Sequence, residues 1–131
     1  GAGQDHHAWC PHHLRRLTMK TVDLAHFQRS RESTIGAGGH VFTLRRPAAL
    51  DVVRARAAGA IDLDFAFGYV VDWNLKESDL LPGGDPEPVA FDAALFKAWV
   101  ADQPELWSAL ANAVMEAYQR HEEAAENRGN A

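Results

Sequence analysis

The chain has 131 residues, of which 47% are apolar and 24% are charged, and its formal net charge is −5. This length suits one domain with a modest core, and the composition is that of an ordinary globular protein. A membrane span needs a run of about 20 apolar residues, which the sequence lacks. The single cysteine, Cys10, excludes an intrachain disulfide. We expect a cytoplasmic protein with no secretory signal, because the first 18 residues have no apolar stretch.

Charge is distributed unevenly along the chain. Residues 1–61 carry nine Lys/Arg against four Asp/Glu, whereas residues 62–126 carry three against fourteen. Such asymmetry is typical of two solvated faces of one domain, or of a protein that presents a basic and an acidic surface to different partners.

Residues 1–18 differ in composition from the rest and precede Met19-Lys20, so we expect them to be a disordered or non-native extension. They contain five side chains that could bind a soft metal, namely His6, His7, Cys10, His12 and His13. Their spacing matches no zinc module, because no second cysteine pair and no following helix would fix the geometry. We therefore predict no metal site and regard these five side chains as adventitious ligands.

Residues 19–131 are predicted to form one α+β domain that is mainly helical. A short helical turn falls within residues 20–30. Glu32–Ile35 and His40–Arg45 are then predicted to form a β-hairpin, because the glycines of the GAGG stretch between them allow positive φ. Pro47 suits the first turn of a helix over residues 48–58. The apolar residues at helical spacing in that helix are Leu50, Val53 and Ala57.

Residues 61–73 give two conflicting signals. Their odd-numbered positions are all apolar, as in a strand: Ile61, Leu63, Phe65, Phe67, Tyr69, Val71 and Trp73. Asp62, however, could cap a helix in which Phe67, Val70 and Val71 follow at helical spacing. We favour the helix, and in either case the segment belongs to the core.

The end of the chain is predicted to be an αα-hairpin. Asp92 can cap a first helix whose apolar residues pair at i, i+4: Leu95, Phe96, Trp99 and Val100. Asp102 and Glu105 flank Pro104 at the start of a second helix. Its apolar stripe consists of Leu106, Leu110, Ala113, Val114, Ala117, Tyr118 and His121. From Glu122 onward the tail is expected to fray.

Residues 74–90 connect the core segment to this hairpin. A connection of this length without regular structure is either functional or disordered. Its apolar anchors and its three prolines favour an ordered crossover loop, because a flexible linker needs neither. We expect Leu80 and Leu81 to dock into the domain, and four acids to face outward: Glu77, Asp79, Asp85 and Glu87.

No catalytic arrangement is visible in the sequence. The serines lack the glycines of a nucleophile elbow, and the Gly-rich stretch at 36–39 has neither a following helix nor a Lys-Ser/Thr pair to bind phosphate. Asp62 and Asp64 resemble a solvated edge more than a metal site. We therefore expect neither an enzyme nor a cofactor. Nucleic acid is not an expected partner either, since the chain is acidic and only four clustered arginines could contact phosphate: Arg45, Arg46, Arg54 and Arg56.

From about Arg31 to Asn127, the chain resembles small tailed-phage and prophage proteins of the tail assembly chaperone type. Four pieces in order carry the resemblance: GGHVFTLRRP, VVDWN, ESDLLPGGDPEPVAFD, and LFKAWVADQPELWSALANAVMEAYQRH. The resemblance implies a non-enzymatic protein of the host cytoplasm. It would bind the tape measure protein and recruit tail tube subunits before the tail polymerises.

Such a role requires apolar grooves and mixed charge rather than an active site. Trp73, Trp99 and Trp107 are the candidate anchors, because tryptophan supplies a large contact area, although for each of them alone a place in the core is the favoured interpretation. Leu80, Leu81 and the four acids of the crossover complete the predicted partner-binding set. Two alternatives remain open: a structural phage adaptor or head–tail connector, and a small metal- or nucleic-acid-binding regulator. The sequence does not predict an oligomeric state.

Overall fold

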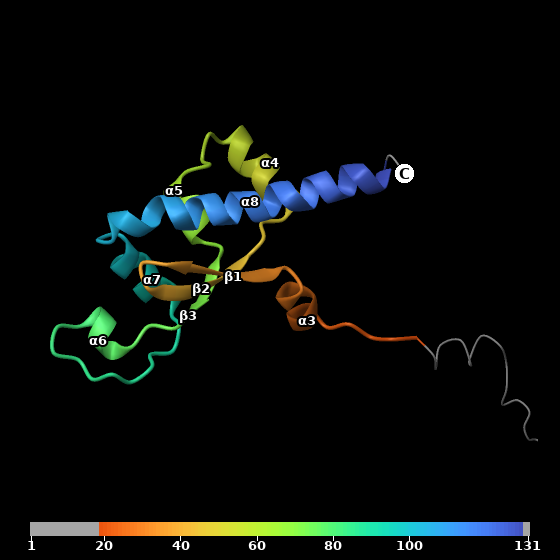
Figure 1. Ribbon diagram of the computed structural model, residues 1–131. Helices are drawn as coiled ribbons and strands as arrows, with labels where there is room; N and C mark the ends of the chain where they lie inside the picture. Colours follow the sequence, from red (N-terminus) through yellow and green to blue (C-terminus); the bar gives the residue numbers. More distant parts are fainter. Residues whose placement is uncertain (1–18, 130–131) are drawn as a thin grey trace, which may run out of the picture.

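The computed structural model describes residues 19–129, which form a three-stranded antiparallel sheet together with helices (Figure 1). This confirms the predicted α+β, mainly helical class. In chain order the elements are α3 (Leu24–Arg29), β1 (Glu32–Ala37), β2 (His40–Arg45), α4 (Ala49–Ala57), α5 (Leu63–Phe67), β3 (Val70–Trp73), α6 (Glu77–Leu80), α7 (Ala93–Val100) and α8 (Pro104–Gly129).

The predicted hairpin is confirmed, and its turn is tighter than the GAGG stretch indicates. Ala37 pairs with His40, so the turn consists of Gly38 and Gly39, whose φ values are 58° and 80°. Both values lie in the left-handed region, where a residue with a side chain is strained. β1 therefore extends to Ala37, two residues further than expected.

The preferred helix over residues 61–73 is correct only for the first half of the segment. Asp62 caps α5, and its carboxylate accepts a hydrogen bond from the amide of Phe65 at 2.9 Å. After a turn at Gly68 the chain becomes β3, in which Trp73 pairs with Phe42 of β2. Both local signals are therefore correct, each for part of the segment. Pairing with β2, which is distant in the sequence, determines where the helix ends and the strand begins.

The face of α4 that packs inward differs from the one that apolar spacing suggests. Its buried residues are Val52 and Ala55, whereas Leu50 and Val53 are 55% and 57% exposed. Pro47 lies before the N-cap residue Ala48 and is fully buried. In the first turn of α4, Asp51 accepts a hydrogen bond of 3.1 Å from the hydroxyl of Tyr69. These two anchors hold the helix in its observed rotation about its axis.

The closing αα-hairpin is confirmed. Asp92 caps α7 by accepting a hydrogen bond of 2.8 Å from the amide of Leu95. At the junction of the two helices, the indole Nε1 of Trp107 donates a hydrogen bond of 2.7 Å to the carbonyl of Val100. α8 continues to Gly129, so the expected fraying from Glu122 is wrong.

The core lies between the sheet, α5, α7 and α8. Figure 1 shows α8 running along the whole domain, with the sheet on one side and α4 on the other. The predicted stripe of α8 supplies four buried residues, which are Leu106, Leu110, Val114 and Tyr118. Leu106, Leu110 and Val114 join one core cluster with Phe42, Leu44, Ala66, Phe67, Val70, Trp73, Leu75, Phe96 and Val100. One face of α7 thus packs in the core with the sheet and α8, and another face of α7 lies beside the crossover.

Candidate partner-binding groove

The crossover of residues 74–90 is closed by hydrogen bonds between its own two halves. The amide of Glu77 donates to the carbonyl of Glu87, and the amide of Ser78 donates to the carbonyl of Asp85, each at 2.9 Å. Nearer the domain, the amide of Val89 donates to the carbonyl of Leu75 at 3.0 Å. These bonds give the crossover the ordered structure that its composition predicts.

The tip of the crossover depends on its two glycines. Gly83 has a φ of 78°, and the amide of Gly84 donates a hydrogen bond of 3.0 Å to the carbonyl of Leu81. A Cβ atom on Gly84 would lie 2.7 Å from the carbonyl oxygen of Glu77, which is closer than real Cβ atoms approach backbone. The Pro-Gly-Gly sequence is therefore what lets the returning half pass against α6.

Two of the four acids that were predicted to face outward also stabilise this loop; Asp79 is exposed as predicted, whereas Glu77 is half-buried. The carboxylate of Asp79 accepts a hydrogen bond of 2.8 Å from the amide of Lys76, at the start of α6. The carboxylate of Glu77 accepts one of the same length from the amide of Asp85. Only Asp85 and Glu87, among the four predicted acids, are exposed without such a bond in the described part of the chain.

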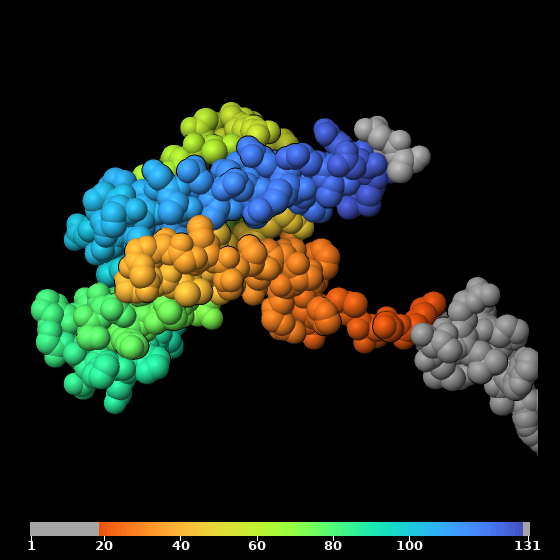
Figure 2. Space-filling view, in the orientation of Figure 1, coloured from red at the N-terminus to blue at the C-terminus, as the bar shows by residue number. Residues whose placement is uncertain are grey.

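The crossover and α7 enclose a groove, which is the candidate functional site. It has a volume of about 360 Å³ and is lined by Asp79, Leu80, Leu81, Leu95, Ala98, Trp99, Asp102 and Gln103. Five of these side chains are apolar, and the carboxylates come from the crossover side and from the end of α7. In the space-filling view, the crossover is the green lobe that stands beside the orange hairpin (Figure 2).

The groove contains four of the nine residues predicted from the sequence, which are Asp79, Leu80, Leu81 and Trp99. Leu80 is partly buried and packs against the core, as expected, whereas Leu81 is 56% exposed and does not dock into the domain. Leu81 is instead available at the mouth of the groove, because the backbone of the crossover turns sharply directly after it.

Trp73 and Trp107 do not line the groove. Trp73 is buried, and its indole Nε1 donates a hydrogen bond of 2.8 Å to the carbonyl of Val89. Trp107 is half-buried and donates to Val100. Both indoles hold backbone in place, so of the three candidate anchors only Trp99 lies where a partner could reach it through the groove.

Leu95, Ala98, Asp102 and Gln103 belong to the groove and were not predicted as site residues. With Trp99 they fall at i, i+3, i+4, i+7 and i+8 from Leu95, which is the spacing of one helical face. The stripe is therefore readable in the sequence. A second stripe of α7, containing Phe96 and Val100, faces the core and carries the stronger apolar signal.

The electrostatic character of the groove is acidic. Asp79 and Asp102 are the charged residues of its lining, and no basic side chain lines it within the described residues. Lys97, the basic residue of α7, pairs instead with Asp64 at 3.3 Å. Asp85 and Glu87 lie exposed on the same crossover and add to the negative potential. The groove therefore suits an apolar side chain that is flanked by basic residues.

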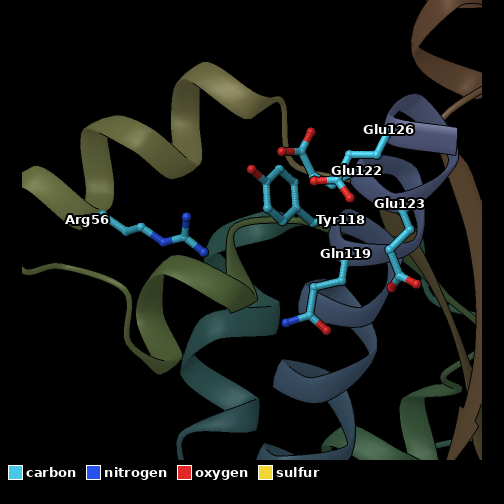
Figure 3. A pocket seen from close by; sticks show the side chains of 6 residues that line it. All are labelled: Arg56, Tyr118, Gln119, Glu122, Glu123 and Glu126. Carbon is cyan, nitrogen blue, oxygen red and sulfur yellow. The ribbon is translucent and has the colours of Figure 1, made fainter. Parts of the chain in front are cut away.

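A second hollow, of about 280 Å³, lies between α4 and the last turns of α8 (Figure 3). It is lined by Arg56, Tyr118, Gln119, Glu122, Glu123 and Glu126. Burial, and then the neighbouring Glu122, raise the pKa of Tyr118. Except for Tyr118, its lining is polar, and it offers no apolar anchor comparable with Trp99.

Within residues 19–129, no group of three or more His, Cys, Asp or Glu side chains is arranged to hold a metal ion. The five candidate ligands His6, His7, Cys10, His12 and His13 lie outside the described residues. In the same range, none of the helices combines the length and the apolar character that a transmembrane segment requires.

Comparison with known proteins gives no match to this chain among family models, curated proteins or solved structures.

Proposed function

We propose that this protein is a non-enzymatic binding protein whose groove receives a helical segment of a partner. The groove itself supports this proposal, because Leu81, Leu95 and Trp99 line it and Asp79 and Asp102 add negative charge to the lining. Leu81 and Leu95 are 56% and 39% exposed, and Trp99 is partly buried against the core. Apolar side chains that line a hollow and are bordered by charge are typical of protein–protein interaction sites.

The groove would recognise an amphipathic helix by two separate effects. One or two large apolar side chains of the partner enter between Leu81 and Trp99, and their burial supplies most of the affinity. Lysine or arginine residues beside them approach Asp79 and Asp102, and this attraction increases the association rate and sets the orientation.

The partner that we propose is a phage tail protein, either the tape measure protein or the tail tube subunit. The support for this choice is the sequence resemblance, and above all its last two pieces, which contain every residue of the groove. In this account the protein is a tail assembly chaperone that acts in the cytoplasm of the bacterial host. The apolar face of a tape measure helix would occupy the groove until the tail polymerises.

The test is co-purification of the full chain with co-expressed tape measure and tail tube proteins. Leu81→Asp should weaken binding at least tenfold, because truncating or charging a central apolar contact commonly costs more than ~1.4 kcal/mol. Leu50→Asp is the matched control, because Leu50 is 55% exposed and Leu81 56%, but Leu50 lies on α4. Equal loss with both variants, or with neither, would refute the groove as the site.

A further inference from the structure

The segment Met19–Arg29, here called the arm, exposes an unusual amount of apolar surface. Its four large apolar residues are Met19, Val22, Leu24 and Phe27, with exposed fractions of 63%, 64%, 69% and 53%. In the described part of the chain, α3 has no buried residue. Figures 1 and 2 show the first residues of the arm extending away from the domain and α3 lying beside the start of β1, where the guanidinium of Arg31 is 5.5 Å from the centroid of the Phe27 ring.

The arm is nevertheless built to hold a helical turn. The carboxylate of Asp23 accepts a hydrogen bond of 2.7 Å from the amide of His26 and so caps α3. Val22 and Phe27 stand at the positions of a hydrophobic staple, which fixes how the chain enters the helix. An isolated helix this short is marginal in water, so a partner for its apolar face would stabilise it.

The arm has the chemistry that the groove lacks. Leu24 and Phe27 lie three residues apart and therefore on one face of α3. Lys20 and Arg29 flank them, whereas Asp23 is the one acid of the arm and is engaged as the cap. The groove offers apolar walls with Asp79 and Asp102 and no basic side chain in its described lining. The arm and the groove are thus complementary in apolar character and in charge.

The arm lies far from the groove of its own chain. α3 precedes the start of β1, whereas the groove lies near the opposite end of that strand, since the ring of His40 beside the hairpin turn is 5.9 Å from the ring of Trp99. Six residues of strand span about 20 Å, so the arm would have to give up its capped helix and turn back along β1 to enter this groove. The groove of a second molecule can receive the arm without such a rearrangement.

We infer that the arm of one copy docks into the groove of a second copy, with Leu24 and Phe27 entering between Leu81 and Trp99. The inference rests on the groove being a binding site, as proposed above, and it requires no phage partner. Because arm and groove are different surfaces, the contact is head-to-tail and produces short chains or a closed ring. The arm then competes with the helical client, so that self-association covers the groove when no client is present.

The test is sedimentation velocity of the full chain across a wide concentration range. The parent protein should form species larger than a monomer as concentration rises, and high salt should weaken them. Phe27→Ser with Leu24→Ser, and separately Leu81→Asp, should each raise the apparent dissociation constant at least tenfold. Val53→Ser is the control, because Val53 is 57% exposed on α4, away from both surfaces.

Mixing the two defective variants gives the decisive result. The arm variant retains its groove and the groove variant retains its arm, so the mixture should form a one-to-one complex that cannot extend. A parent that stays monomeric at every concentration would overturn the inference. So would a groove variant that associates like the parent, or a mixture that forms no complex. Binding of a basic amphipathic peptide to the arm variant tests the groove separately, so failure of the inference is distinguishable from failure of the proposed function.

Discussion

Trp73 and Val89 close the crossover, because the indole Nε1 of Trp73 donates a hydrogen bond of 2.8 Å to the carbonyl oxygen of Val89. Trp73 is the last residue of β3, and Val89 lies just before the chain leaves for α7. The ring of Trp73 also packs edge-on against Phe91, with 5.1 Å between the ring centroids. Trp73 thus holds the returning half of the crossover in place, whereas Trp99 lines the groove itself.

Trp73→Phe should loosen the crossover without unfolding the domain. The substitution keeps most of the buried aromatic surface but removes the N–H donor, at a cost of ~0.5–1.5 kcal/mol. Amide hydrogen exchange should accelerate in residues 76–89. Trp107→Phe is the matched control, because it removes the equivalent bond to Val100. If both variants exchange alike in the crossover, Trp73 does not hold it.

Leu110→Ala should be strongly destabilising. Leu110 is fully buried in the stripe of α8, and removing a buried leucine side chain costs ~2–5 kcal/mol through lost burial and the cavity left behind. Leu50→Ala, on the exposed face of α4, should stay within ~0.5 kcal/mol of the parent. Urea denaturation measures both. A small effect at Leu110 would mean that α8 does not close the core as described.

The phenol of Tyr69 should lose its proton only at an unusually high pH. Burial, followed by the hydrogen bond to Asp51, raises the pKa of Tyr69 to about 12. The folded state therefore holds this proton more tightly than the unfolded state, where the pKa is ~10. The stabilisation is complete below pH ~10 and is lost as the pH rises toward 12.

Ultraviolet titration of tyrosinate absorbance measures this directly. Asp51→Ala should lower the pKa of Tyr69 part of the way toward its ordinary value, since burial, the larger cause, remains. Tyr118→Phe removes the second of the two tyrosines of the chain, so the remaining signal belongs to Tyr69. A pKa that Asp51→Ala leaves unchanged would show that the hydrogen bond plays no part.

Neutralising the exposed acids of the crossover should slow association with a basic helical partner. Asp85→Asn with Glu87→Gln removes two charges but no side-chain hydrogen bond that the structure records, so the association rate should fall at low salt and converge with the parent rate at high salt. Stopped-flow measurements across salt concentrations test this. Glu116→Gln with Glu123→Gln, on α8, is the control. Equal slowing in both double variants would indicate a general charge effect.

Much of the fold follows from signals within a few residues. Asp62 and Asp92 act as the caps that their positions predict, and Gly38-Gly39 form the hairpin turn. The stripe of α8 is also local, because it repeats every three or four residues. β3 and the rotation of α4 could not be predicted in this way, since each depends on a partner distant in sequence: β2 for the strand, and Tyr69 for the helix.

Several residues of the candidate groove could be predicted from the sequence, but the surface that they form together could not. Leu80, Leu81 and Trp99 are apolar residues in a segment that suggests interaction, and the structure brings them together. Trp73 has the same chemistry and is buried instead, because β3 carries it beneath the crossover. α7 has one apolar stripe toward the core and a second toward the crossover, and only the packing of the helix decides which residues remain accessible.

Binding of a helical segment in the groove between the crossover and α7 is tested most directly by nuclear magnetic resonance of the isotope-labelled full chain. During titration with a basic amphipathic helix from the tape measure protein, chemical shifts should change at the indole of Trp99 and at the methyl groups of Leu81 and Leu95. The shifts of Leu50 and Val53 should stay unchanged. Changes confined to α4, or to the hollow beside Arg56, would contradict binding in the groove.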